Sequence, residues 1–200
     1  MDHPDFRPIS ITPVLIRTMK RLIVTQFLNP AITYSNTAKF SDQYAFRPTG
    51  SLKAAIISLL HTVTHLLIDN PYVIVISLDF SKAFDTVRHS ALLDKMAQLD
   101  LPDEVYNWPV SCFSGHLHCT HYQGNVSTVS KITASVIQGS SIGPAPNVVN
   151  TGDLQAVTLG NQMIRFADDT YIIIPAINAN SRLSINQSIN QSEKYLTCPE

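Results

Sequence analysis

The chain has 200 residues, of which 44% are hydrophobic and 14% are charged, and its formal net charge is −1. A chain of this length buries enough apolar surface to form a core, and ordinary hydrophobicity with little charge excludes intrinsic disorder. The near-zero net charge gives no electrostatic reason, by itself, to expect a nucleic-acid partner. An odd number of cysteines without paired spacing excludes a disulfide framework; they are Cys112, Cys119 and Cys198.

The apolar runs are short. The longest, at 72–76 and 171–174, have the length of strands, whereas a bilayer requires roughly 20 residues. Residues 1–5 lack the basic and apolar regions of a signal peptide. We therefore expect an intracellular protein without a membrane segment. No Gly/Ser linker or charge block divides the chain, which predicts one domain.

Two helices are predicted in the first 70 residues. Thr12 and Pro13 are a favourable N-cap and first-turn pair, and apolar residues recur at helical spacing from there until Asn29 and Pro30, where the helix is expected to end. Ser51 is the predicted N-cap of the second helix. The apolar residues of this second helix form one predicted stripe: Ala55, Ile56, Leu59, Leu60, Val63 and Leu67.

The hydrophobic period then changes from that of a helix to that of a strand. Residues 72–78 are rich in β-branched side chains, which predicts a strand buried on both faces that ends at Asp79. A third helix is predicted from Ser90, with its apolar side chains turned inward: Leu92, Leu93, Met96 and Leu99.

Two hairpins are predicted in the second half of the chain. The first has arms at 117–122 and 126–136 around the turn residues Gln-Gly-Asn. The second has arms at 161–166 and 171–175, which flank residues 167–170.

Residues 138–146 are rich in Gly, Ser and Pro and predict a loop. The sequence Ser-Ile-Asn-Gln occurs at 184–187 and again at 188–191, which predicts a short amphipathic helix. Strands that alternate with helices, together with two hairpins, predict an α+β fold with a largely antiparallel sheet.

Three carboxylates stand at the ends of predicted strands. Asp79 ends the most apolar strand, and Asp168 and Asp169 lie at the tip of the second hairpin. Carboxylates beside buried strands lose solvation and repel one another, and Mg²⁺ relieves both costs. The alternative is structural, because Asp is common in turns and as a helix cap. These features alone leave both interpretations open.

Five segments, in order, resemble the motifs of the reverse transcriptases of non-LTR (LINE-type) retrotransposons. Residues 5–10 and 43–48 resemble two fingers motifs, and residues 78–87 resemble the first palm motif. Residues 137–144 resemble the glycine-containing motif, and Phe-Ala-Asp-Asp at 166–169 resembles the aromatic-x-Asp-Asp hairpin of the third palm motif.

The resemblance implies a right-hand polymerase palm with part of the fingers and no thumb. Residues 1–200 would be a partial reverse transcriptase domain, with fingers and palm helices at about 1–70 and palm at 71–200. The implied activity is RNA-directed DNA polymerisation, in which a dNTP extends a DNA primer on an RNA template.

The resemblance also implies roles for individual residues. Asp79, Asp168 and Asp169 would be catalytic and hold two Mg²⁺ ions, for which Mn²⁺ is a possible substitute. The other matched residues would bind substrate. Arg7 would clamp the triphosphate, Phe80 would offer its backbone to it, Phe84 would exclude a ribose 2′-hydroxyl, and Gln138 and Gly139 would lie beside the nascent base pair.

Some residues depart from the family pattern. Pro146, Asn147 and Asn150 fall where the family has a continuous apolar helix, and a proline in a helix interior costs about 3 kcal/mol. His116 replaces a usual arginine. The chain begins at the second fingers motif and stops before the fourth palm motif is complete, so we expect weak primer–template binding.

Other functions are considered beside the polymerase. An inactive remnant that binds nucleic acid or protein is the main alternative. A phosphatase or nuclease is disfavoured because Asp79 lacks a second Asp two residues later, and Phe84 disfavours an RNA-directed RNA polymerase. No zinc site is predicted from the cysteines and histidines at 112–121, because strand alternation turns them to opposite sides.

Overall fold

The computed structural model describes residues 13–34, 40–48, 50–80, 84–115, 117–135 and 144–179. The chain divides into two compact units. One combines Met1–Ser35 with Phe84–Asn150, and the other combines Asn36–Ala83 with Thr151–Glu200. Each unit is therefore assembled from two separate stretches of sequence.

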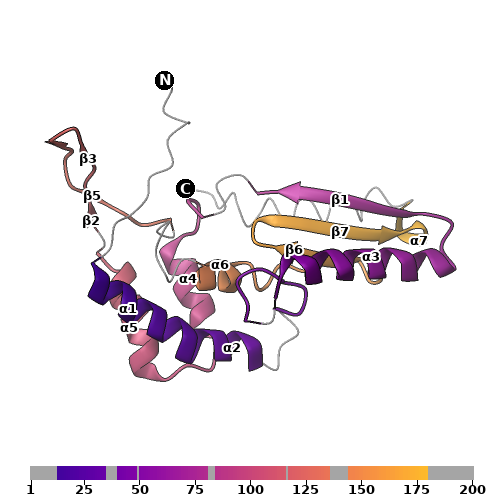
Figure 1. Ribbon diagram of the computed structural model, residues 1–200, viewed down its shortest axis with the longest axis horizontal. Coiled ribbons are helices and arrows are strands. Elements are labelled where there is room, and N and C mark those ends of the chain that lie inside the picture. The colour runs from indigo at the N-terminus through magenta and orange to yellow at the C-terminus, as the bar shows by residue number, and fades with distance from the viewer. Residues whose placement is uncertain are drawn as a thin grey trace. The chain divides into compact units, whose positions relative to one another are not determined.

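The second unit contains a three-stranded antiparallel sheet. Its strands are β1 (Val73–Asp79), β6 (Gln162–Phe166) and β7 (Asp169–Pro175), and their order is β1-β7-β6. Figure 1 shows β7 between its two neighbours. The sheet and its helices confirm the predicted α+β fold, and β6 and β7 confirm the second hairpin. Its turn is shorter than expected, because β7 already begins at Asp169.

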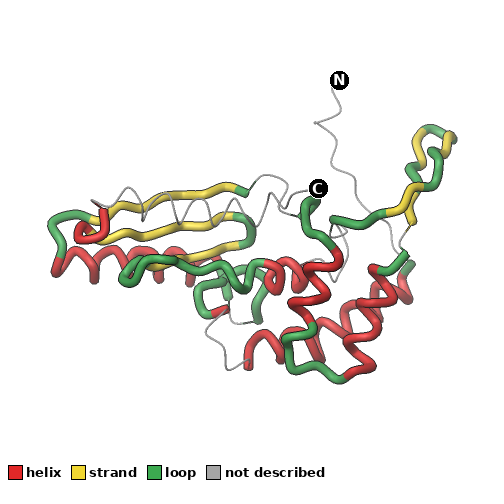
Figure 2. The backbone as a smooth tube through the Cα atoms, turned by 180° about the vertical axis from the view of Figure 1, so that it is seen from behind, coloured by secondary structure: helices red, strands yellow, loops and turns green. Residues whose placement is uncertain are grey.

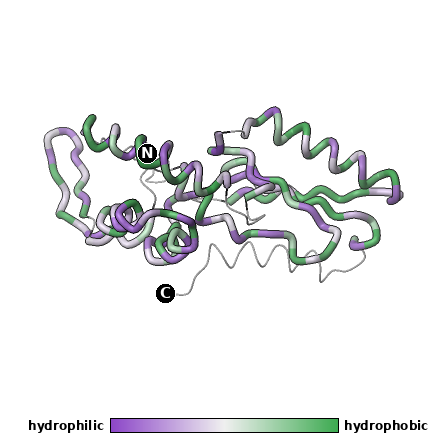
Figure 3. The backbone as a smooth tube through the Cα atoms, turned by 90° about the horizontal axis from the view of Figure 1, so that it is seen from below, coloured by the Kyte–Doolittle hydropathy of each residue, from purple (hydrophilic) through white to green (hydrophobic). Residues whose placement is uncertain are grey.

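Alternate side chains of these strands enter two separate cores. One face of the sheet buries Met163, Ile172 and Ile174 with Leu154. The opposite face buries Ile164 and Ile173 against the helix α3 (Leu52–Asp69). The strands are hydrophobic along most of their length (Figure 3), as expected for a sheet covered on both sides. The short helix α7 (Ala176–Ala179) follows β7 and packs against β7 and β1.

The strand β1 is not buried on both faces, so that prediction is wrong. Burial alternates along it, with Val75 43% exposed and both Ser77 and Asp79 exposed. The α3 helix contacts β1 less than it contacts β6 and β7. The run of apolar residues concealed this, because Val75 is as apolar as the covered residues beside it.

The helix α3 begins where predicted. The Ser51 side chain accepts a hydrogen bond from the Ala54 N–H at 3.1 Å, which is the expected N-cap. Only part of the predicted stripe faces the sheet, namely Ala55, Leu59 and Val63. The outer side of the helix is also apolar and is exposed; it includes Leu52, Ile56, Ile57, Leu60, Leu67 and Ile68.

By length and composition alone, α3 is long and apolar enough to cross a membrane, and 6% of it is buried. The sequence did not show it as an apolar run because Lys53, His61 and His65 interrupt it. One such helix is weak evidence for a membrane span. The absence of a membrane segment stays a prediction.

The first unit contains a long helix made of α1 (Val14–Ile23), the π-helical η2 (Val24–Leu28) and α2 (Asn29–Tyr34). The expected end at Asn29 and Pro30 is wrong, because the helix continues to Tyr34. Proline has no N–H and its ring clashes with a carbonyl one turn earlier, so a wider turn accommodates it. The Asn29 N–H accordingly bonds to the Val24 carbonyl, five residues back.

The described residues of this unit form three further helices: α4 (His89–Met96), α5 (Asp103–Phe113) and α6 (Pro144–Asn150). The α4 helix confirms the predicted third helix, whereas α5 was not predicted. The expected interruption is wrong for Pro146 and Asn147, which lie inside α6, whereas the helix does end at Asn150. Pro144 and Pro146 occupy the first turn of α6, where backbone N–H groups need no intrahelical acceptor.

The first predicted hairpin is confirmed as a narrow ribbon of short strands. Its outer pair is β2 (Leu117–His118) with β5 (Ser130–Lys131), and its inner pair is β3 (His121–Tyr122) with β4 (Asn125–Val126). Figure 2 shows the ribbon extending away from the helices of its own unit. Gln123 and Gly124 both have positive φ, the pattern of a type I′ turn.

Candidate active site

Two of the predicted carboxylates face one another across the sheet. Asp79, the last residue of β1, pairs with Asp169, the first residue of β7. The backbone groups of Arg165 point away from β7, on the outer edge of β6: its N–H donates to the Asp42 carbonyl, and its carbonyl accepts from the Tyr44 N–H. Backbone groups alternate direction along a strand, so those of the next residue, Phe166, point inward and bond with Asp169. The backbone groups of Asp169 therefore face β6, and Asp169 forms a non-hydrogen-bonded pair with Asp79. Such pairs have Cα atoms about 4.5 Å apart and their side chains on one face.

The third carboxylate lies in the turn beside this pair. Ala167 and Asp168 are the two turn residues, and Phe166 pairs with Asp169 to close the turn. Ala167 has a φ of 59°, which is unfavourable for a residue with a Cβ atom. The tight turn therefore brings Asp168 next to Asp169, at a cost in backbone strain.

The carboxylates are accessible to solvent. Asp79 and Asp169 are exposed and Asp168 is half-buried. Like charges directly opposite one another in a sheet are destabilising, so a bound cation would offset a cost that the register itself creates. Among the described residues, no three His, Cys, Asp or Glu side chains group closely enough to hold a metal ion by themselves. Mg²⁺ is compatible with this arrangement, because it is usually held by one or two carboxylates together with substrate phosphates and water.

The other predicted site residues are placed differently. Phe80 packs into the core with Ile76 and Leu78, on the face opposite Asp79. Its side chain thus anchors the end of β1. Phe84 is half-buried and belongs to the other unit. Arg7, Gln138 and Gly139 lie outside the described residues, as do loop residues 138–143 and the tail repeats. The roles of all five stay predictions.

A buried ion pair supports the strand that carries the turn, and sequence reasoning missed it. Arg165 is 1% exposed, and its Nε donates to Asp42 Oδ2 at 3.1 Å, while Nη2 contacts Oδ1. Its third nitrogen donates to the Thr151 carbonyl. The backbone of Tyr44 completes the connection by donating to the Arg165 carbonyl at 2.9 Å. This ion pair anchors β6 two residues before Ala167.

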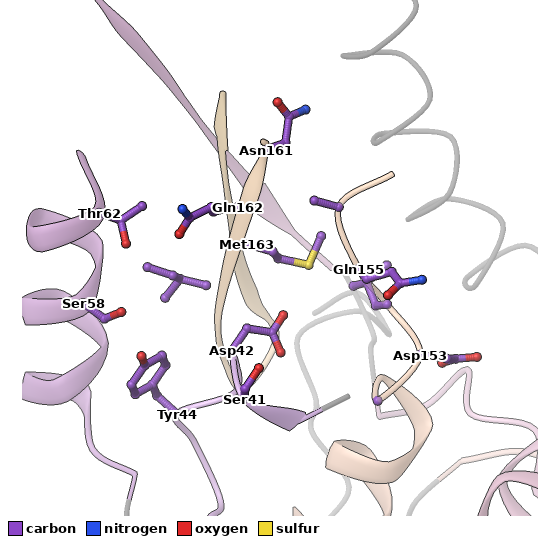
Figure 4. Close-up of a pocket in the computed structure, with 14 residues that line it drawn as sticks. Ser41, Asp42, Tyr44, Ser58, Thr62, Asp153, Gln155, Asn161, Gln162 and Met163 are labelled. Carbon is purple, nitrogen blue, oxygen red and sulfur yellow. The ribbon is translucent and has the colours of Figure 1, made fainter. Parts of the chain in front are cut away.

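A cavity of about 670 Å³ lies at the β6 side of the second unit. Figure 4 shows Ser58 and Thr62 of α3 on one side of it, Gln162 and Met163 of β6 behind, and the segment with Gln155 on the other side. The three predicted catalytic carboxylates do not line it. The candidate site is therefore the open end of the sheet rather than this cavity.

A family model described as "Reverse transcriptase (RNA-dependent DNA polymerase)" matches residues 2–196. The chain belongs to the reverse transcriptase family. This confirms the resemblance, and the facing carboxylates lie in the two segments that carried its first and third palm motifs.

The relatives are polymerases of mobile elements. The chain is 27% identical over 179 residues to the RNA-directed DNA polymerase from mobile element jockey of Drosophila melanogaster, which covers 86% of this chain. It is 26% identical over 172 residues to the probable polymerase from transposon X-element of the same fly, covering 84% of the chain. The chain spans 19% of the length of each relative.

A solved structure of telomerase from Candida tropicalis, in complex with a TWJ fragment of telomeric RNA, has a similar fold. It aligns with a TM-score of 0.64 at 13% identity, and the match covers 90% of this chain and 31% of the telomerase chain. At this identity the likeness concerns the fold alone. It supports the α+β palm and fingers fold that was predicted.

Proposed function

We propose that the chain is part of an RNA-directed DNA polymerase of a LINE-type retroelement. The observation that carries this proposal is the facing pair of Asp79 and Asp169 beside Asp168, in a chain of the reverse transcriptase family. Its substrates would be an RNA template, a DNA primer and dNTPs, and its location intracellular.

The three carboxylates fit the oxygen ligands that Mg²⁺ prefers, and they would hold the two ions together with the substrate phosphates. When bound, the ions activate the primer 3′-hydroxyl and neutralise charge on the leaving pyrophosphate. Mn²⁺ is a possible substitute. The protein contributes the position of these ligands. The sheet register sets Asp79 opposite Asp169, and Phe80 and the Asp42–Arg165 pair hold the two strand ends on which they lie.

The remaining substrate contacts follow the family match. Arg7 would bind the triphosphate, with the backbone of Phe80 beside it. Phe84 would favour deoxynucleotides, because its ring would clash with a ribose 2′-hydroxyl. Gln138 and Gly139 would lie along the nascent pair.

The main alternative is an inactive remnant. One of its supports was the interrupted helix, and Pro146 itself fits the first turn of α6, although that helix ends at Asn150. Its other support is that the chain spans 19% of the length of each of these relatives. The activity of these 200 residues is therefore a matter for direct measurement.

Primer extension by the purified chain on poly(rA)/oligo(dT) with Mg²⁺ and dTTP tests the proposal. We expect extension that is lost in Asp168→Ala/Asp169→Ala and much weaker with UTP. No extension by a chain shown to be folded by circular dichroism would favour the remnant. Equal extension by the variant would assign the activity to other groups.

A further inference from the structure

A pair of hydroxyl side chains lies beside the carboxylates on the same face of the sheet. Ser77 pairs with Tyr171 in the register that pairs Asp79 with Asp169. Side chains two residues apart along a strand project to one face, so all four share that face. Two residues at about 3.4 Å each place the hydroxyl pair, Ser77 and Tyr171, about 7 Å from the carboxylates.

The helix that covers this face, α3, lies mainly over β6 and β7 and leaves one side of β1 exposed. The next pair along the strands is Val75 with Ile173. Ile173 is fully buried against α3, whereas its partner Val75 is 43% exposed. Ser77 is exposed and Tyr171 is half-buried. An open strip therefore runs from the carboxylates back to Val75.

Within the ranges that the structure describes, neither the Ser77 hydroxyl nor the Tyr171 phenol has a hydrogen-bond partner. A half-buried tyrosine in a core usually pairs its hydroxyl. Both groups are thus available to a bound molecule at the edge of the active site.

We propose that Ser77 and Tyr171 are positioning residues that bind the last nucleotide of the primer. The inference rests on the proposed function, in which the primer 3′-hydroxyl lies at the carboxylates. The rest of that nucleotide extends away from the reacting atom, and the open strip offers it hydroxyl donors and an aromatic side chain. Tyr and Ser side chains commonly donate to sugar and phosphate oxygens of nucleic acids, and aromatic rings stack on bases.

The strip suits the primer better than the incoming nucleotide. A triphosphate carries several charges and is bound by cationic groups. Between the carboxylates and the apolar Val75, the described side chains of the strip are neutral and offer a triphosphate no cation. A sugar with a single phosphate matches two neutral donors beside an apolar residue.

Binding of a fluorescein-labelled oligo(dT) primer on oligo(rA), followed by fluorescence anisotropy, tests the inference without requiring chemistry. Tyr171→Phe keeps the ring and removes the hydroxyl, and we expect the Kd for primer–template to rise about 3- to 10-fold, as for one lost hydrogen bond. Ser77→Ala should act similarly, and Ser77→Thr should restore binding because it keeps the hydroxyl. Tyr72→Phe, an exposed tyrosine outside the sheet, is the matched control and should leave the Kd unchanged.

Steady-state kinetics of primer extension separate an effect on primer binding from an effect on dTTP binding. The primer KM should rise in Tyr171→Phe while the KM for dTTP stays that of the wild type. Wild-type primer affinity in Tyr171→Phe, or an increase confined to the dTTP KM, would overturn the inference. A wild-type chain that binds the duplex but does not extend it would instead contradict the proposed function and leave the binding result interpretable.

Discussion

Removing the charge of Asp42 should destabilise the second unit. Arg165 is 1% exposed and keeps its charge, so Asp42→Asn leaves a buried cation with a neutral partner and the Thr151 carbonyl. Breaking a fully buried pair costs about 3 to 5 kcal/mol. Because Asp42 is 21% exposed and the amide keeps one oxygen acceptor, we expect about 2 to 3 kcal/mol here.

Urea unfolding followed by far-UV circular dichroism measures this cost. With a slope near 2 kcal/mol per molar urea, the midpoint should fall by about 1 to 1.5 M. Asp94→Asn, a change at an exposed carboxylate of α4, should stay within about 0.5 kcal/mol of the wild type. The double variant Asp42→Leu/Arg165→Met replaces both charges with apolar groups and should be far less destabilised than the sum of the single variants. A wild-type midpoint for Asp42→Asn, or additive losses in the double variant, would refute the reasoning.

Three smaller effects follow from local structure. Ala167→Gly should raise the free energy of unfolding by about 1 kcal/mol, because glycine adopts a φ of 59° without strain; a lower urea midpoint would contradict this. Ser51→Ala should lower it by about 1 kcal/mol through loss of the bond from the Ala54 N–H, measured by thermal unfolding, and no change would show that the cap contributes nothing. Burial raises the pKa of the Cys112 thiol, and the charge of Lys20 lowers it by less. The contribution of this shift to the stability of the folded chain is present below the ordinary thiol pKa and is lost as the pH rises through the raised pKa. Alkylation of Cys112 in a Cys119→Ser/Cys198→Ser background should therefore be slower in the folded chain than in urea at pH 8, and equal rates would contradict the shift.

The local elements could be predicted because their signals are short-range. Ser51 is followed by a helix because its side chain satisfies an N–H three residues later. Gly124 marks the ribbon turn because a type I′ turn requires positive φ, which glycine adopts without strain. The third palm motif predicts a hairpin because its apolar arms flank two carboxylates, and the structure places them at the tip.

The features that escaped prediction depend on distant partners. Asp42 and Arg165 are 123 residues apart, and neither residue type is expected inside a core unless it is paired. The exposed face of β1 was missed because α3 lies mainly over β6 and β7 and covers the edge strand β1 less, which no property of the strand itself reveals. The helix through Pro30 was missed because a π-helical turn accommodates a proline that ordinarily ends a helix.

The central claim is that the register of β1 and β7 makes one metal-binding position from Asp79 and Asp169. Replacement of Mg²⁺ by Fe²⁺, followed by ascorbate and peroxide, cleaves a polypeptide next to the bound ion. The account predicts simultaneous cleavage near residue 79 and near residues 167–170, displaced by excess Mg²⁺, lost in Asp79→Asn and retained in Asp94→Asn. Cleavage at only one of these places, or unchanged cleavage in Asp79→Asn, would contradict it.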